Sequence, residues 1–127
     1  MQAKYFFISA LAASLHACGT PDVIVDSSDD NHCSLLSFYF SGLAKYADAP
    51  DEQQLATKTI FEWYASKERQ QAEREGVETV KRRVLSLEPV FDAIKKNPNS
   101  MTDELEACSA RAQKSVGFTE FARTISL

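Results

Sequence analysis

The sequence predicts an all-α fold, a small bundle of four to five helices in which one disulfide links the first and last core helices. Apolar residues recur every three or four positions, as they do on one face of a helix, and prolines and glycines stand where these patterns stop. No stretch has the alternating pattern of a convincing strand. The 127 residues, of which 44% are hydrophobic and 25% charged, suit one folded domain.

The first helix is predicted over residues 31–47, the most apolar and aromatic run outside the N-terminus. Asp29, Asp30 or Asn31 can cap its first N–H groups, and negative charge there suits the helix dipole. The expected apolar stripe is wide enough to pack against two neighbouring helices. It consists of Leu35, Leu36, Phe38, Phe40, Leu43, Ala44 and Tyr46.

The second helix is predicted over residues 51–75, directly after Pro50, which fits the start of a helix. From Lys67 onward almost every side chain is polar, so this half should project past the core or lie on its rim. Gly76 then ends the pattern. The apolar face of the first half carries Leu55, Thr59, Ile60, Trp63 and Tyr64.

The third helix is predicted over residues 77–96, where apolar residues repeat with heptad spacing. Pro89 lies inside this pattern and lacks an N–H group, so it should kink the helix or restart it. Pro98 is the expected stop. The repeating residues are Val77, Val80, Val84, Leu87, Phe91 and Ile94.

The fourth helix is predicted from residue 99, with Ser100 and Asp103 as a variant of the capping box. Gly117 suits its C-terminal end, and residues 118–125 form a last amphipathic segment that would close the core. The face expected to be buried carries Leu105, Cys108, Ala112 and Val116.

The N-terminal residues 1–17 have the pattern of a signal peptide. Lys4 precedes an uncharged run over residues 5–15, and small residues follow. The run is too short to cross a hydrocarbon core of ~30 Å as a helix. The alternative is that these residues form a buried helix of the domain.

The end of this leader resembles a bacterial lipobox, in the sequence Leu15-His16-Ala17-Cys18-Gly19. The resemblance implies lipidation of Cys18 and a membrane anchor, although His16 departs from the small residue usual at that position. Ordinary cleavage after Ala17 or Ala13 is the alternative. The predicted organisation is a signal peptide (1–17), a tether (18–30) and a helical-bundle domain (31–127).

The three cysteines fit an exported chain. Acylation of Cys18 leaves Cys33 and Cys108 to pair in an oxidising compartment. Without acylation, Cys18 keeps a free thiol. Two reduced, buried cysteines in a cytosolic protein are the remaining interpretation.

No pattern in the sequence predicts catalysis, a metal or a cofactor. We find no Glu-x-x-His, His-x3-His or Cys-x-x-Cys-His ligand spacing and no phosphate-binding glycine loop. His32 adjoins Cys33, but neighbouring side chains on a helix point about 100° apart, so they do not pair as base and nucleophile. The formal charge is −4, and it becomes −5 when Lys4 leaves with the leader. A net acidic chain gives no electrostatic basis for binding nucleic acid or an anionic membrane surface. The basic run Lys81-Arg82-Arg83 is interpreted as the solvent-exposed face of the third helix, with a binding patch as the alternative.

The pattern over residues 31–111, with one cysteine opening the first core helix and another in the last, resembles small exported bacterial helical-bundle proteins of uncharacterised role. It is more loosely similar to periplasmic acid-stress chaperones. The first resemblance implies an α-helical bundle with one disulfide and implies no activity.

We therefore expect a non-enzymatic exported interaction protein, periplasmic and anchored through a lipid on Cys18. The candidate interaction surface is the aromatic group Phe61, Trp63 and Tyr64, whose alternative place is the core. A narrower version is an inhibitor or immunity protein against a periplasmic toxin. An acid-stress chaperone and a hydrolase with dispersed carboxylates are the competing functions.

Overall fold

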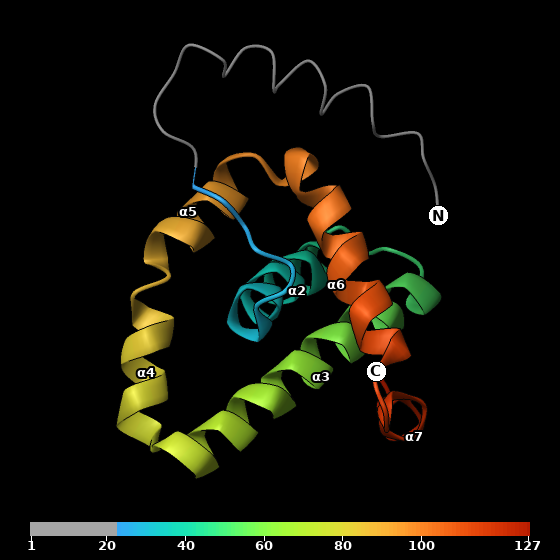
Figure 1. The fold of residues 1–127 in the computed structure, drawn as a ribbon. Coiled ribbons are helices and arrows are strands. Elements are labelled where there is room, and N and C mark those ends of the chain that lie inside the picture. Colours follow the sequence, from blue (N-terminus) through green and yellow to red (C-terminus); the bar gives the residue numbers. More distant parts are fainter. Residues whose placement is uncertain (1–22) are drawn as a thin grey trace.

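The computed structural model describes residues 23–127, and within them the chain is helical without a strand. The all-α prediction is confirmed (Figure 1). The elements in chain order are α2 (Asp30–Tyr46), α3 (Asp51–Glu75), α4 (Val77–Leu85), α5 (Glu88–Lys96), the 3₁₀ helix η2 (Pro98–Met101), α6 (Thr102–Lys114) and α7 (Phe118–Ala122).

Helix α2 is the central element, and it packs most extensively along α3. Helices α5 and α6 also contact it, while α4 adjoins the far end of α3 (Figure 1). The first turn of α2 is capped by Asp29, whose carboxylate accepts the N–H groups of Asn31 at 2.8 Å and His32 at 3.3 Å. Among the three predicted capping residues, Asp29 is therefore the one used.

The buried face of α2 differs from the predicted apolar stripe. Phe38 is 51% exposed and Tyr46 is 91% exposed, whereas Ser37 is buried. Ser37 tolerates burial because its hydroxyl donates to the Cys33 carbonyl at 2.6 Å. The buried residues of α2 are Asn31, Cys33, Ser34, Leu36, Ser37 and Ala44.

The predicted third helix is broken into α4 and α5, which raises the number of α-helices in the described part of the chain to six. Pro89 lies in the first turn of α5, where its missing N–H costs nothing, so it restarts the helix. The predicted capping box of the next helix is wrong. Ser100 lies in η2 and donates to the Asn97 carbonyl at 2.8 Å, and no side chain caps α6.

The core gathers side chains from α2, α3, α5, α6 and α7, together with Val25, which is 8% exposed. Val25, which falls in the predicted tether (18–30), therefore packs with the core. The predicted signal peptide and Cys18 lie outside the described residues. The buried cluster comprises Val25, Cys33, Leu36, Ile60, Trp63, Tyr64, Val90, Ile94, Cys108, Ala112 and Phe118.

The predicted disulfide is present between Cys33 on α2 and Cys108 on α6, 75 residues apart. The two Cα atoms are separated by 5.7 Å, within the range usual for disulfides, and both residues are fully buried. Closing a loop of this length restricts the unfolded chain, a contribution of about 4–5 kcal/mol in the chain-entropy model.

Replacing both cysteines (Cys33→Ala with Cys108→Ala) is expected to lower the free energy of unfolding by about 2–5 kcal/mol, because the unfolded chain regains its freedom. Urea unfolding of the chain without its first 17 residues measures the change. Cys18→Ser is the matched control, since that cysteine does not belong to the bond. Equal stability of the double variant and the control would contradict a structural role for the disulfide.

Candidate functional site

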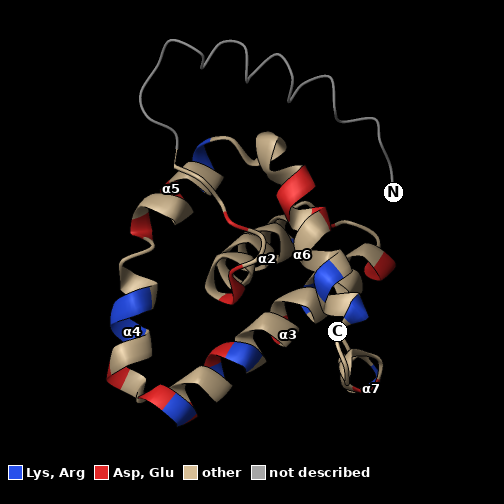
Figure 2. Cartoon of the chain, in the orientation of Figure 1, with Lys and Arg blue, Asp and Glu red and all other residues tan. Residues whose placement is uncertain are grey.

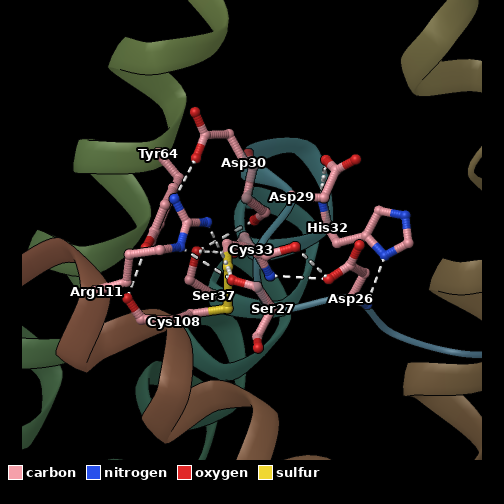
Figure 3. The surroundings of a disulfide bond; sticks show 12 residues. Asp26, Ser27, Asp29, Asp30, His32, Cys33, Ser37, Tyr64, Cys108 and Arg111 are labelled. Carbon is pink, nitrogen blue, oxygen red and sulfur yellow. Dashed lines mark hydrogen bonds and ion pairs between the residues drawn. A yellow bond between two sulfur atoms is a disulfide. The ribbon is translucent and has the colours of Figure 1, made fainter.

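The disulfide is enclosed by a polar cluster built around Arg111 of α6 (Figure 3). The Arg111 guanidinium pairs with the Asp30 carboxylate of α2 at 2.8 Å and donates to the Ser27 carbonyl at 3.1 Å. It also lies 5.2 Å from the centre of the Tyr64 ring. We call Arg111, Asp30 and Ser27 the Arg111 clasp. It joins the segment before α2 to α6.

Tyr64 of α3 lies beneath this clasp and is 1% exposed. Its hydroxyl donates to the Cys108 carbonyl at 2.6 Å, so α3 meets α2 and α6 at the disulfide. Burial raises the pKa of Tyr64, because the phenolate would lose its hydration there.

The predicted aromatic interaction surface does not exist as an exposed patch. Trp63 is 6% exposed and packs edge-on against Phe118 and Phe121 of α7, with ring centres 5.3 and 5.4 Å away. Phe61 is partly exposed and lies 5.4 Å from the half-exposed Phe38. Trp63 and Tyr64 belong to the core because α6 and α7, distant in sequence, cover that face of α3.

The segment preceding α2 is held by its own turn. The Asp26 carboxylate accepts the Ser28 hydroxyl at 2.7 Å and the Ser28 N–H at 3.0 Å, and these hydrogen bonds lower the pKa of Asp26. The Asp26 N–H donates to Nδ1 of His32 at 2.9 Å. That bond requires an imidazole with no proton on Nδ1.

A second polar contact joins the start of α2 to α3. Asn31 is 3% exposed and donates to one oxygen of Glu68 at 2.8 Å, while Ser34 donates to the other at 3.2 Å. Buried amides and hydroxyls need such partners. These bonds therefore explain why two polar residues face α3.

An apolar groove of about 380 Å³ opens between α3, α6 and α7. Its volume lies in the range of ligand-binding pockets. Glu52 is the one ionisable residue among those that line it. The main apolar contributions come from Leu55, Ala56, Ile60, Leu105, Phe118 and Ala122.

Sequence reasoning missed both the groove and the Arg111 clasp. The groove needs three helices whose crossing no local pattern specifies. A signal for Arg111 was present, since it follows Cys108 by three positions and so lies on the same side of α6. Such a cation beside a buried cysteine could have been interpreted as a partner for the carboxylates before α2.

The remaining charged residues include three consecutive cations on α4, Lys81, Arg82 and Arg83. Figure 2 shows acidic and basic positions intermixed along α4 and the adjoining end of α3. The pair of Arg83 and Glu75 joins these two helices and lowers the pKa of Glu75. Across residues 23–127, no three His, Cys, Asp or Glu side chains gather closely enough to hold a metal ion.

Among the helices of residues 23–127, none combines the length and apolar character that crossing a membrane requires.

Comparison with known proteins finds no matching family model, no similar curated protein and no similar solved structure. Function is therefore inferred from the groove, the disulfide and the sequence pattern of the leader.

Removing the Tyr64 hydroxyl (Tyr64→Phe) is expected to lower the free energy of unfolding by about 1 kcal/mol, because the bond to Cys108 is lost. Tyr46→Phe is the control, since Tyr46 is 91% exposed. Urea unfolding at neutral pH measures both.

The same pair of variants tests how the contribution of Tyr64 to the free energy of unfolding depends on pH. The folded state keeps the Tyr64 proton longer than the unfolded state, so its contribution is complete below pH ~10 and is lost as the pH rises through the raised pKa. The alkaline loss of stability should therefore be smaller in Tyr64→Phe than in the wild type and unchanged in Tyr46→Phe. Equal alkaline slopes in all three proteins would exclude this role.

Proposed function

We propose that this protein is an exported, non-enzymatic interaction protein that binds a segment of a partner protein in the groove between α3, α6 and α7. The observation that carries the proposal is the groove itself, which is open to solvent and lined mainly by apolar side chains. Its floor includes Ile60 and Phe118, two residues of the buried core cluster. A partner side chain there would extend the core of the bundle.

The composition of the groove favours binding over catalysis. General acid–base and nucleophilic mechanisms need at least two reactive groups that converge on one substrate position. Glu52 has no second ionisable residue beside it in the groove lining. The hydroxyls of Ser37, Thr57, Thr59 and Ser109 supply hydrogen-bonding partners at the edges.

The charges near the groove select the kind of partner. Glu52 lines the groove, and Asp48 and Asp51 precede it in the sequence, at the corner between α2 and α3. Within residues 23–127, none of these three exposed carboxylates forms an ion pair. The fitting occupant is an amphipathic helical segment with an apolar stripe and a Lys or Arg beside it.

Export supports the same proposal. Disulfides persist in oxidising compartments, so the Cys33–Cys108 bond favours export to such a compartment. With the leader pattern, it favours a periplasmic protein anchored through a lipid on Cys18. An inhibitor or immunity protein against an exported toxin is a narrower form of this proposal.

The mass of the mature protein tests the export proposal. We expect a chain that begins at Cys18 and carries acyl groups, with two fewer hydrogens than the reduced form because Cys33 and Cys108 are joined. Intact mass spectrometry of the protein from its own cells, before and after reduction, reads the three features together. An unprocessed mass that starts at Met1 would contradict export through this leader.

Blocking the groove tests the binding proposal. Ala56 is exposed and lines the groove, so Ala56→Arg should fill it with little cost to the core. The probes are two labelled helical peptides that share one apolar stripe and differ only in basic or acidic flanking residues. Fluorescence anisotropy should show binding of the basic peptide and an affinity reduced at least about tenfold in Ala56→Arg.

Ala107→Arg is the matched control, because Ala107 is exposed on α6 and does not line the groove. It should bind the basic peptide as the wild type does. Glu52→Lys should reverse the preference between the two peptides. Equal binding by the Ala56→Arg and Ala107→Arg variants would show that the groove is not the site.

A further inference from the structure

The Cys33 sulfur is covered on two sides by groups that do not belong to the helical core. The Ser27 carbonyl oxygen lies 3.2 Å from Sγ of Cys33, and the Arg111 guanidinium lies 3.4 Å from it. Both cysteines are 0% exposed. A reductant that attacks the Cys33 sulfur must therefore displace the segment before α2, or Arg111, or both.

This cover is fastened by groups that change charge in acid. Asp30 holds Arg111 in place, and Asp29 caps the first turn of α2. Asp26 fixes the preceding turn through Ser28, and its N–H donates to His32. The fastening therefore depends on three carboxylates and on an unprotonated ring nitrogen.

We propose that residues 25–29 and the Arg111 side chain form an acid-released cover over the Cys33–Cys108 disulfide. The release is local, because Cys33 lies in the first turn of α2 after the cover and keeps α2 bonded to α6. It exposes Val25 and the disulfide while the contacts of α3 with α2 and α7 stay in place. This property is independent of what the groove binds.

The charges that face the cover from the neighbouring helices determine the sign of the effect. Asp30 faces Arg111 of α6 and Tyr64 of α3, and Asp29 lies near Arg83 of α4. Acid removes the negative charges and leaves both arginines charged, so attraction is lost.

Two further groups complete the local charge arrangement. His32 on α2 acts on Asp26, and this attraction lasts only while Asp26 is ionised. Glu68 of α3 accepts hydrogen bonds from Asn31 and Ser34 at the start of α2.

The carboxylates determine the pH range in which the cover opens. The pKa of Asp26 is lowered by its bonds to Ser28, so the stability that it contributes is present above the usual carboxyl value and is lost as the pH falls through the lowered pKa. The cover should therefore open below the usual aspartate pKa of ~3.9, as the pH falls through the lowered pKa of Asp26.

The test measures how fast a water-soluble phosphine reduces the disulfide at pH 7 and pH 3.5 in the folded protein. The phosphine attacks one sulfur, the S–S bond breaks, and water converts the phosphonium to the oxide and leaves two thiols. Rates are divided by those of a small linear disulfide at the same pH. The normalised rate should rise at least about fivefold in acid for the wild type.

Asp30→Asn keeps the shape of Asp30 but removes its charge, so it should raise the normalised rate at pH 7 and flatten the pH dependence. Asp92→Asn is the matched control, because Asp92 pairs with Lys95 on the exposed surface of α5. It should behave as the wild type does. Trp63 fluorescence, recorded in parallel, should stay native at pH 3.5, since Trp63 lies in the core beside α7.

Three results would overturn the proposal. One is a normalised reduction rate that does not change with pH. Another is an Asp30→Asn variant with the wild-type pH profile. The third is loss of the native Trp63 signal with the same midpoint as the rise in rate, which would make the exposure global unfolding.

Discussion

The junction of three helices at the disulfide is the constraint on which the rest of this fold depends. The bond between Cys33 and Cys108, which are 75 residues apart, joins α2 to α6. The Tyr64 hydroxyl of α3 donates to the Cys108 carbonyl and so connects α3 to the same point. The covalent bond acts mainly by restricting the unfolded chain, whereas the hydrogen bond orients the folded one. Once α6 is fixed across α2 and α3, α7 can cover Trp63 and the groove has its third wall.

The helices and the disulfide could be predicted from the sequence because their signals are local or depend on counting. Proline and glycine positions mark the helix boundaries, and α3 extends over Asp51–Glu75 as the pattern of residues 51–75 predicts. Pro89 indicates a break, and assigning Cys18 to the predicted lipidation site leaves Cys33 and Cys108 as one pair. These features require no knowledge of how the helices cross.

The orientation of α2 could not be predicted in the same way. Hydrophobicity alone favours burying Phe38 and Tyr46, yet Ser34 and Ser37 lie inside. Their hydroxyls find acceptors at Glu68 and at the Cys33 carbonyl, and those acceptors are known only when the helices are packed. Similarly, Trp63 and Tyr64 have an apolar face whose cover comes from the end of the chain. Partners distant in sequence decide which residues become surface.

The groove and the disulfide are physically connected through Ser37. This residue lines the groove, and its hydroxyl donates to the carbonyl of Cys33 in the preceding turn of α2. On α6, Leu105 and Ser109 face the groove while Cys108 faces α2, so both features use adjacent stripes of one helix. Any ligand that binds only the folded arrangement of α3, α6 and α7 stabilises it by mass action. Linkage is reciprocal, so a ligand that binds the oxidised fold more tightly than the reduced fold shifts the disulfide toward the oxidised form by the same factor.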